Sequence, residues 1–309
     1  MIDRGSKSVL LTGAGGFVGR HCIERLAGAG FEVHAVRSKK VEGGEGSGAV
    51  WHRADLLDRD AAKALVETVR PSHLLHLAWY GERDFYHSDH NFAWVEASFD
   101  LLRHFAANGG ERVVMAGSSA EYDWSDGTCS EATTQLAPAT LYGSCKRAMG
   151  LLFEAFVESA GLSGAWGRIF FIYGPGQREE TLVGHVISSI LKGERARCSS
   201  GVQLRDFLYV EDVADAMVAL LHSDVAGPLN VGSGIPIRVR DLAVAAASGL
   251  QAADMIDFGA IEASDAASSV VADTVRLQRD VGWLPAFTLE RGMERTIDWW
   301  RSRLELAAP

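Results

Sequence analysis

Two side chains that could transfer a proton stand four residues apart in the segment Tyr142-Gly143-Ser144-Cys145-Lys146. On a helix this spacing puts both side chains on one face, roughly 6 Å apart along the axis. A free phenol has a pKa of about 10 and is a poor base at neutral pH. A neighbouring ammonium group and the N-terminus of the helix both favour the phenolate. The pair is therefore suited to giving a proton to a carbonyl oxygen, or to taking one in the reverse direction.

A hydroxyl group that could hold the same oxygen lies upstream, in the segment Gly117-Ser118-Ser119. These residues follow Arg112–Ala116, an apolar run that predicts a strand. At the carboxyl end of such a strand, a serine hydroxyl can hydrogen-bond a substrate oxygen and align it. A tyrosine and a lysine at this spacing are common by chance. Their place after the serines and after a glycine-rich loop is what makes the set informative.

The glycine-rich loop is Thr12-Gly13-Ala14-Gly15-Gly16-Phe17-Val18-Gly19, between an expected strand at Ser8–Leu11 and an expected helix at Phe17–Ala27. Gly13 permits a tight turn, Gly16 lets the backbone approach a pyrophosphate, and Gly19 lets helix and strand pack closely. The N-terminus of the helix offers free N–H donors and a positive dipole end to phosphates. In this position the motif predicts a dinucleotide cradle rather than an ordinary glycine-rich turn. The expected cofactor contacts are Thr12, Gly13, Gly16, Phe17 and Val18.

The end of the second expected strand, Glu32–Val36, bears on which nicotinamide cofactor fits the cradle. In NAD-binding sheets an Asp or Glu at this point holds the ribose 2′-hydroxyl. Here the strand is followed by Arg37, Ser38 and two lysines, with no carboxylate. A guanidinium group fits a 2′-phosphate through two hydrogen bonds and cannot replace a carboxylate on a hydroxyl. We therefore expect NADP(H), bound through Arg37 and Ser38. The alternative is a basic surface turn whose charges are merely solvated.

Short β-rich runs alternate with longer helical patterns along the chain. This alternation predicts an α/β fold of the Rossmann type, a doubly wound, mostly parallel sheet with helices on both faces. Further strands are expected at Ala49–Arg53, His73–Leu77, Ala165–Ile172 and Leu229–Val231, with paired strands within Arg195–Gln203. Further helices are expected at Ala61–Val69, Val95–Ala107, Leu141–Ser159, Thr181–Leu191, Val210–Leu221 and Leu289–Leu304, and a glycine-rich turn at Gly43–Gly48. Asp55 and Leu56, after the third strand, are placed to meet the adenine, although an ordinary loop aspartate explains Asp55 nearly as well.

After Tyr173 the alternation loosens, which indicates a smaller second lobe. No linker-like stretch separates two halves of the chain, so we expect this lobe to be made of interleaved segments. Residues 1–172 are expected to form the dinucleotide-binding domain, with 204–233 returning to it. Residues 173–203 and 234–309 are expected to form the substrate-binding lobe.

Composition and charge argue against several other classes of protein. The chain has 309 residues, 47% of them hydrophobic, and a net charge of −10. An acidic surface argues against nucleic acid or an anionic membrane as the main partner. No apolar run reaches membrane-spanning length, and no secretory signal is visible. The four cysteines are widely spaced, which favours free thiols in a reducing compartment. We therefore expect a soluble, cytoplasmic protein.

Histidines and aromatic residues gather around the fourth expected strand. His73 and His76 lie within it, and strand alternation points them to opposite faces, so no metal site is expected. Asn91 could cap the following helix or tether neighbouring backbone, and capping is the preferred interpretation. The aromatic residues fit substrate stacking and loop packing about equally well; they are Trp79, Tyr80, Phe85, Tyr86 and Trp94.

Taken in order, these motifs resemble the extended short-chain dehydrogenase/reductase family, and within it the branch that modifies nucleotide sugars. The resemblance covers nearly the whole chain. Besides the glycine loop and Tyr142–Lys146, it includes Leu77-Ala78, Ser118–Tyr122, Arg168–Gly176, Arg205-Asp206-Phe207, Asn230–Ser233 and Gly282–Pro285. The resemblance implies that Ser119, Tyr142 and Lys146 are catalytic, and that Lys146 also binds the nicotinamide ribose. It places Leu77 and Ala78 against the cofactor.

The same resemblance implies a nucleoside-diphosphate sugar as substrate. Arg205 matches an arginine that holds the diphosphate of such a sugar, unless it forms a structural ion pair with Asp206 or Glu211. In relatives the helices that match Val95–Ala107 and Leu141–Ser159 pair across a two-fold axis, so a homodimer is the expectation for the assembly.

Three departures from the family pattern bear on the reaction. Sugar dehydratases of this branch carry an Asp-Glu pair directly after the catalytic hydroxyl, as acid and base for the elimination of water. Ala120 and Glu121 stand in those places, so elimination is not expected. Phe171 replaces an asparagine that touches the sugar phosphate in many relatives, and Trp79 replaces a small residue and would narrow the sugar pocket. The expected substrate contacts are Trp79, Ser119, Glu121, Phe171 and Arg205.

These observations predict an NADPH-dependent reductase acting on the keto group of a nucleoside-diphosphate sugar, most like the reductases of 4-keto-6-deoxy sugars. Tyr142 would protonate the carbonyl oxygen, with Ser119 hydrogen-bonded to it. An epimerase that retains its NAD(P) cofactor is the first alternative, and Arg37 argues modestly against it because such enzymes commonly hold NAD. A non-catalytic NADP sensor on the same fold is the second, and the presence of all three catalytic residues argues against it.

Overall fold

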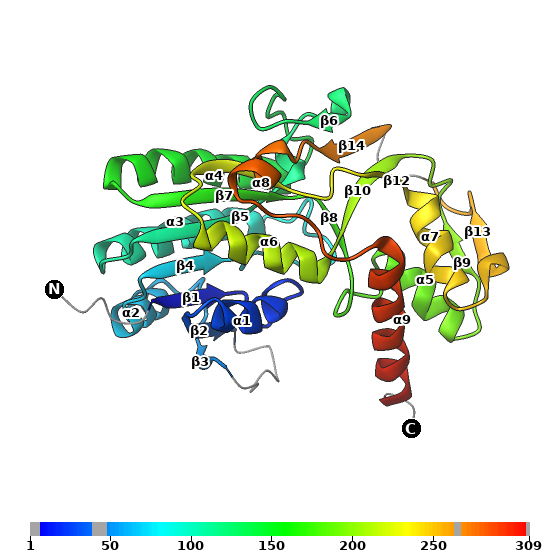
Figure 1. Cartoon of the computed structure of the whole chain (residues 1–309), viewed down its shortest axis with the longest axis horizontal. Coiled ribbons are helices and arrows are strands. Elements are labelled where there is room, and N and C mark those ends of the chain that lie inside the picture. Colours follow the sequence, from blue (N-terminus) through cyan, green and yellow to red (C-terminus); the bar gives the residue numbers. More distant parts are fainter. Residues whose placement is uncertain (1–6, 39–47, 263–266, 307–309) are drawn as a thin grey trace.

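A seven-stranded parallel sheet forms the centre of the larger lobe (Figure 1). The computed structural model describes residues 7–38, 48–262 and 267–306. Its strands are β1 (Ser8–Thr12), β2 (Glu32–Arg37), β3 (Val50–Arg53), β4 (His73–His76), β5 (Arg112–Ser118), β7 (Ser163–Ile169) and β11 (Gly227–Val231), in the order β11-β7-β5-β4-β1-β2-β3. The order reverses between β1 and β4, and sheets with such a reversal bind ligands in a crevice outside the carboxyl ends of the two strands.

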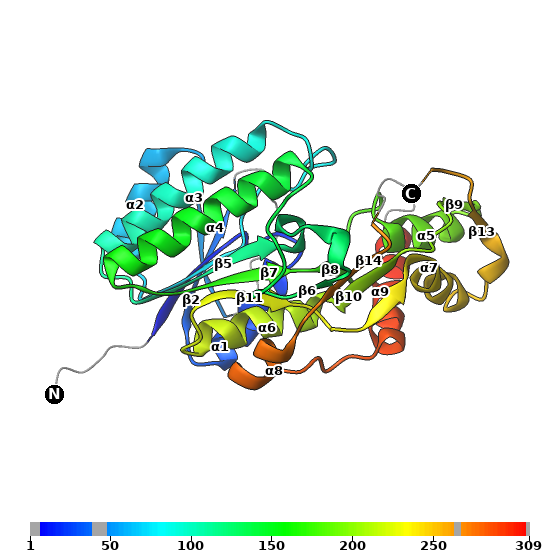
Figure 2. The same ribbon diagram turned by 90° about the horizontal axis from the view of Figure 1, so that it is seen from above.

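Helices cover both faces of this sheet (Figure 2). One face carries α1 (Gly19–Gly28), α6 (Val210–His222) and α8 (Val275–Asp280), and the other carries α2 (Arg59–Val69), α3 (His90–Ala107) and α4 (Leu141–Ala160). Successive side chains of β1 point to opposite faces of the sheet. Val9 and Leu11 pack into one apolar cluster, and Leu10 packs into the other. A strand that is buried on both faces is typical of a doubly wound sheet, so the expected Rossmann-type α/β fold is confirmed.

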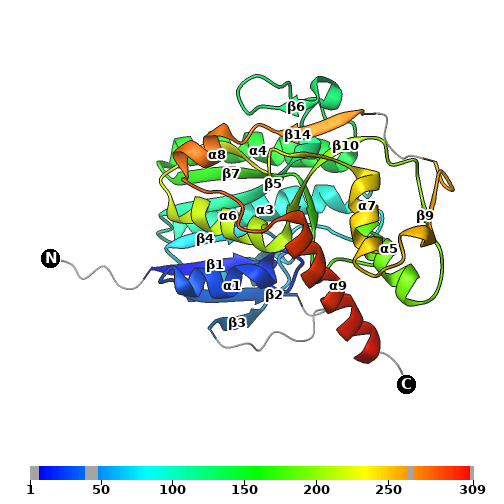
Figure 3. The ribbon, with the colours of Figure 1, turned by 45° about the vertical axis from the view of Figure 1, so that its right-hand side comes forward.

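The smaller lobe lies beyond the carboxyl ends of the large sheet, at the end of the molecule opposite the start of β1 (Figure 3). Its main sheet contains β6 (Thr128–Cys129), β8 (Phe171–Tyr173), β10 (Leu204–Tyr209), β12 (Pro236–Arg238) and β14 (Ser269–Ala272). A second, two-stranded sheet pairs β9 (Ala196–Cys198) with β13 (Ile256–Phe258). The helices of the lobe are α5 (Leu182–Leu191), α7 (Val239–Ser248) and α9 (Leu289–Leu306).

The chain passes between the two lobes at points that differ from the sequence expectation. The strand expected at 165–172 is divided into β7 and β8, which belong to different sheets, because at Phe170 the backbone N–H bonds to Val231 and the chain then leaves the large sheet. The return expected for 204–233 starts only with α6, since β10 pairs with β8, β12 and β14.

Two further local expectations were wrong, and a third lies mostly outside the described residues. Within 195–203 only the short β9 is a strand, because the chain turns at Gly201, where φ is +64°. Helix α1 begins at Gly19 rather than at Phe17. The glycine-rich turn expected at 43–48 lies outside the described residues except for Gly48. None of the described helices combines the length and the apolar character that crossing a bilayer requires.

Candidate active site

Helix α4 brings Tyr142 and Lys146 to the carboxyl end of β5. The helix is capped by Thr140, whose side chain accepts a hydrogen bond from the Gly143 N–H at 3.1 Å. Gly143 allows the helix to touch the turn after β5, because a Cβ there would lie 2.2 Å from the Ala120 carbonyl oxygen. Lys146 Nζ lies 5.9 Å from the centre of the Tyr142 ring and donates a 2.8 Å hydrogen bond to the Ala116 carbonyl of β5. The spacing of the pair thus places both side chains on the face that meets the sheet.

Burial shifts the pKa values of this pair in opposite directions, downward for Lys146 and upward for Tyr142. Lys146 is only 3% exposed, and burial lowers the pKa of its ammonium to about 7, with Glu121 acting in the opposite direction. Burial raises the pKa of the half-buried Tyr142, while a hydrogen bond from Ser118 partly offsets this rise. The phenol is therefore protonated at neutral pH, as the donor of a proton to a carbonyl oxygen must be.

Two serines stand at the end of β5, Ser118 within it and Ser119 directly after it, and they have different neighbours. The Ser118 hydroxyl contacts Tyr142 and also accepts a hydrogen bond from the Ala120 N–H at 3.2 Å. Ser119 begins a short 3-10 turn (Ser119–Glu121), is buried, and accepts a 2.8 Å hydrogen bond on its carbonyl oxygen from the indole of Trp124. The family resemblance singled out Ser119 as the aligning hydroxyl and missed the contacts of Ser118 and Trp124.

Glu121 does not face the substrate side, which corrects the expectation from sequence. Its side chain is fully buried and accepts hydrogen bonds from the Ser118 N–H at 2.7 Å, the Trp166 indole at 3.0 Å and Arg168 Nε at 2.8 Å. Arg168 in turn donates to the Tyr122 hydroxyl at 3.0 Å. The carboxylate therefore neutralises a buried arginine, because a buried charge needs such a partner. Its bond to the Ser118 N–H also holds the 3-10 turn Ser119–Glu121, called the serine turn below.

Trp79 lies over the lysine, with its indole face toward the ammonium group. Lys146 Nζ is 3.7 Å from the centre of its ring system, and its indole N–H donates a 2.8 Å hydrogen bond to Asn91. Asn91 is buried inside α3, whose N-cap is Asp89, and donates to the carbonyl oxygens of Phe85 and Ser88. The preferred interpretation of Asn91 as a cap was wrong, and its alternative, a backbone tether, is confirmed.

The aromatic loop between β4 and α3 covers Tyr142. The rings of Phe85 and Tyr86 meet the Tyr142 ring edge-on, at centroid distances of 5.0 and 5.9 Å. The Tyr142 N–H also donates a 3.1 Å hydrogen bond to the Tyr86 carbonyl. The loop therefore packs on α4 and covers part of the Tyr142 ring.

The glycine loop has the shape that a dinucleotide needs. Gly13 has φ of +69°, and a Cβ there would lie 2.8 Å from the Ala78 nitrogen, so the first turn and the end of β4 touch. A Cβ at Gly19 would lie 2.1 Å from the Gly13 oxygen. The Thr12 hydroxyl accepts from the Ala78 N–H at 3.3 Å, next to the half-buried Leu77, and this contact ties β1 to β4. Phe17 and Val18 lie at the start of α1, beside this turn.

Basic and histidine side chains around the glycine loop bond to it or pack near it. Arg20, exposed on the first turn of α1, donates to the carbonyl oxygens of Gly15 and Gly16 at 3.1 and 3.0 Å. A basic residue directly after the last glycine was the sequence signal for this contact, and it was missed. His76 bonds Thr12 at 2.7 Å, whereas His73 packs on Phe31 of the opposite face, as the alternation predicted.

Most of the residues expected at the adenosine end of the cofactor are more exposed. Arg37 ends β2 half-buried, with its guanidinium carbon 5.6 Å from the centre of the Trp51 ring, and Ser38 beside it is exposed. Asp55 is exposed and accepts from the Leu57 N–H at 3.0 Å. Leu56 is 7% exposed and belongs to the core, which leaves little of its side chain for a cofactor.

The expected substrate residues of the smaller lobe form one cluster. Arg205 is 2% exposed, and its guanidinium carbon lies 5.5 Å from the Phe171 ring and 5.7 Å from the Trp124 ring. It donates to the carbonyl oxygens of Leu204 and Ala267. The two carboxylates considered as its ion-pair partners bond elsewhere: Asp206 to Ser233, Gly234 and Ala272, and Glu211 to Arg25 and Arg295.

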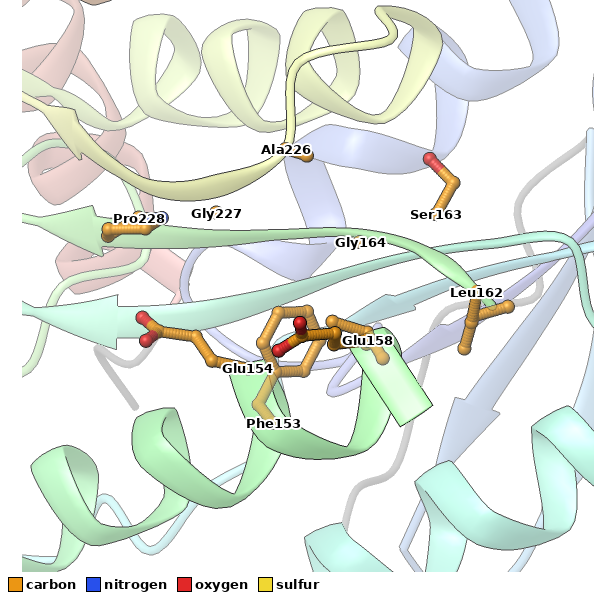
Figure 4. Close-up of a pocket in the computed structure, with 10 residues that line it drawn as sticks. Phe153, Glu154, Glu158, Leu162, Ser163, Gly164, Ala226, Gly227 and Pro228 are labelled. Atoms are coloured by element: carbon orange, nitrogen blue, oxygen red, sulfur yellow. The ribbon is translucent and has the colours of Figure 1, made fainter. Parts of the chain in front are cut away.

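A separate hollow of about 360 Å³ lies at the other end of the large sheet (Figure 4). Its lining includes Phe153 and Glu154 of α4 and Gly164 near the start of β7. Because Tyr142, Lys146 and the serines stand at the carboxyl ends of the strands, this hollow is not part of the candidate active site.

Comparison with known proteins places this arrangement in a family. The model of the NAD dependent epimerase/dehydratase family matches residues 9–232. UDP-glucuronic acid decarboxylase 1 of Xenopus tropicalis is 27% identical over 319 residues, which cover 98% of this chain and 74% of that protein. The solved structure of MoeE5 with UDP-glucuronic acid and NAD is 30% identical, with a TM-score of 0.84, over 96% of this chain and 99% of that one. UDP-glucose 4-epimerase of Thermus thermophilus, solved with NAD, is 25% identical, with a TM-score of 0.85, over 95% of this chain and 99% of that one. The chain therefore belongs to the NAD dependent epimerase/dehydratase family.

Proposed function

We propose that this protein reduces the keto group of a nucleoside-diphosphate sugar, with NADPH as the hydride donor and Tyr142 as the proton donor. A 4-keto-6-deoxyhexose is the sugar we favour. The observation that carries the proposal is the burial and ion pairing of Glu121, the carboxylate in the serine turn. Glu121 is fully buried and bonded to Arg168, so it cannot act as the base of an elimination, and the neighbouring position is Ala120. Tyr142 then remains as the group placed to transfer a proton.

The fit of a dinucleotide is supported by the cradle, where Cβ atoms at Gly13 and Gly19 would collide with backbone. When bound, the cofactor supplies the hydride for the carbonyl carbon. The residues of this chain do the rest. Tyr142 donates its proton to the carbonyl oxygen, and Ser118 and Ser119 stand where hydroxyl groups can hold that oxygen. Lys146 supplies the positive charge that stabilises the phenolate left behind.

The choice of NADP(H) over NAD(H) is part of the same proposal. It is supported by Arg37 at the end of β2 and by the absence of a carboxylate at that point of the sequence. The expected neighbours Lys39 and Lys40 lie outside the described residues. An arginine is the side chain best suited to a 2′-phosphate, because its planar fork of donors matches the phosphate oxygens.

We propose that the sugar nucleotide binds between the larger lobe, which carries the glycine loop, and the smaller lobe. Arg205 is the residue we propose for its diphosphate, and Phe171 and Trp124 form the adjoining wall. This requires the Arg205 guanidinium to exchange carbonyl partners for phosphate oxygens. The relatives solved with UDP-glucuronic acid and with UDP-glucose support the class of substrate.

The test is incubation of the purified protein with NADPH or NADH and a panel of nucleoside-diphosphate keto-sugars. We expect stoichiometric loss of NADPH absorbance with at least one 4-keto sugar, and a slower reaction with NADH. NMR of the product would give the stereochemistry of the new alcohol. No oxidation of either cofactor with any keto-sugar would contradict the proposal.

A nucleotide-sugar epimerase is the second candidate, favoured by the likeness to the Thermus thermophilus epimerase solved with NAD. An epimerase oxidises and re-reduces the same sugar, so it consumes no added cofactor. Interconversion of two saturated nucleotide sugars at constant NADPH absorbance would favour this candidate over the reductase.

We also propose that the protein forms a homodimer through α3 and α4, which lie side by side on one outer face (Figure 2). Large apolar side chains are exposed there: Phe92 of α3 is 54% exposed, and Leu151 and Leu152 of α4 are 54% and 41% exposed. Self-association across a two-fold axis would bury them. Replacing Leu151 with Glu should convert a dimer into a monomer in analytical ultracentrifugation, whereas a wild-type monomer would contradict the proposal.

A further inference from the structure

The ammonium group of Lys146 is held in a setting with few anions. An ammonium has three N–H donors, and one of them bonds the Ala116 carbonyl at 2.8 Å. The face of the Trp79 indole is the next contact, with Nζ only 3.7 Å from its centre. A cation at this distance from an indole is attracted by the ring quadrupole, and the attraction grows when both groups are removed from water.

The charged and titratable groups around Lys146 do not provide a direct ion pair within the described part of the chain. Glu121 acts on it from the turn after β5, but its carboxylate is bonded to Arg168. His76 of β4 is buried, and burial lowers its pKa to about 3, so this imidazole is neutral. Tyr142 of α4 is protonated before it reacts. The indole face and the Ala116 carbonyl are therefore the direct contacts that stabilise the positive charge.

Trp79 is itself fixed from α3. Its N–H bonds the Oδ1 of Asn91 at 2.8 Å, and the Nδ2 of Asn91 donates to Phe85 and Ser88 at 2.6 and 2.8 Å. Asn91 is completely buried, so its own atoms in each of these bonds are shielded from water. Trp94 packs beside the indole, with ring centres 6.4 Å apart. The plane of the indole is thus set by a different helix from the one that carries Lys146.

We propose that Trp79 is a positioning residue for Lys146, with its indole face, locked by Asn91, holding the ammonium group beside Tyr142. The inference rests on the proposed function in one respect, namely that the ammonium group of Lys146 stabilises the Tyr142 phenolate during the reduction. The position of the ammonium on the indole is a property of the protein alone. It gives Trp79 a role other than contact with the sugar, which was its expected role from sequence.

The contact has a direct spectroscopic signature. The chain has six lysines, so protein labelled with ¹³C at lysine Cε gives few signals. The Cε protons of Lys146 should be shifted upfield by the ring current of Trp79, and the variant Lys146→Met identifies their signal. In Trp79→Leu this signal should return to the position of the other lysines. Its titration midpoint should fall by about one pH unit, because the loss of a desolvated cation–π contact disfavours the ammonium.

Two further variants separate this role from general packing. Trp79→Phe keeps an aromatic face and should retain part of the upfield shift and most of the activity. Trp94→Leu removes a neighbouring indole of the same size and should leave the Lys146 signal in place. If Trp79→Leu fails to fold, the wild-type spectrum and the Trp79→Phe titration still test the contact.

Unshifted Lys146 protons in the wild type, or an equal response to Trp79→Leu and Trp94→Leu, would overturn the inference. Activity gives an independent comparison. If the signature is present and no keto-sugar is reduced, the contact stands and the proposed function fails. If reduction is observed but Trp79→Leu leaves both the pH profile and NADPH binding unchanged, the proposed function stands and the positioning role fails.

Discussion

The two ends of the cofactor crevice are built in different ways. At the catalytic end Lys146, Glu121 and Asn91 are all buried, and each has hydrogen-bond partners from a different element. At the adenosine end Arg37 is half-buried and Ser38 is exposed, on the outer strands of the sheet. The first end is enclosed, whereas the second is only partly buried. Substitutions at the catalytic end should therefore change chemistry and stability, and substitutions at the adenosine end should change only the choice of cofactor.

The largest expected effect is the loss of the proton donor. Tyr142→Phe should lower kcat for keto-sugar reduction by about two to four orders of magnitude, the usual contribution of a positioned acid. NADPH binding, followed by the fluorescence of the bound cofactor, should be nearly unchanged. Tyr80→Phe is the matched control, because Tyr80 lies in the aromatic loop that packs on Tyr142 and its hydroxyl donates to the exposed Asp84. Equal kcat values for Tyr142→Phe and wild type would remove the proposed mechanism.

The buried ion pair beneath the serine turn is expected to give the next largest effect. Arg168→Met leaves Glu121 charged and without its main partner in a dry site. Its free energy of unfolding should fall by about 3 to 5 kcal/mol, as measured by urea denaturation. Breaking the exposed pair of Arg195 and Asp257 by Asp257→Asn should change stability little, because solvent already screens it. If the free energy of unfolding falls by a similar amount in both variants, the buried ion pair contributes no more to stability than an exposed one.

The contrast between the two ends also explains what the sequence could predict. Tyr142 and Lys146 on one helix face, and the turn at Gly13, follow from local spacing, and the structure has both. The role of Glu121 depends on Arg168, which lies 47 residues further along the chain. No local pattern reveals that this carboxylate faces inward, so the family position suggested a substrate contact instead.

The same reason applies to Trp79 and to the end of β7. Trp79 meets Lys146 only because the loop after β4 folds back on α4, a contact between residues far apart in sequence. The run at 165–172 has a continuous strand pattern, and only the bond from Phe170 to Val231 shows where one sheet ends. Contacts of this kind are determined by tertiary packing, which a single sequence does not display.

A charge reversal at the adenosine end should alter cofactor choice without altering the chemistry. Arg37→Asp should lower kcat/KM for NADPH by about ten- to a hundredfold, the value of one or two charge-assisted hydrogen bonds, and raise kcat/KM for NADH. The melting temperature should be close to that of wild type. Arg59→Asp, at an exposed arginine of α2, controls for a change in net charge. Retention of the NADPH preference in Arg37→Asp would refute the assignment of this end to the 2′-phosphate.

The smallest expected effect near neutral pH is a pH dependence that belongs to the catalytic end alone. Burial lowers the pKa of Lys146 from its ordinary value near 10.5 to about 7 in the cofactor-free protein. Since the ammonium form is the one that supports Tyr142, kcat/KM should be level below about pH 7 and fall as the pH rises through this value, by about tenfold per pH unit. Tyr142 adds no fall in this range, because burial raises its pKa.

Lys146→Arg separates this effect from other titrations, because a guanidinium remains charged throughout. The alkaline fall should be absent from the profile of this variant, even if its activity is lower at every pH. Arg37→Asp should keep the fall at the same pH as wild type, since Arg37 lies at the other end of the crevice. A fall that persists in Lys146→Arg, or that moves in Arg37→Asp, would mean that the two ends are electrostatically coupled. The separation of chemistry from cofactor choice would then not hold.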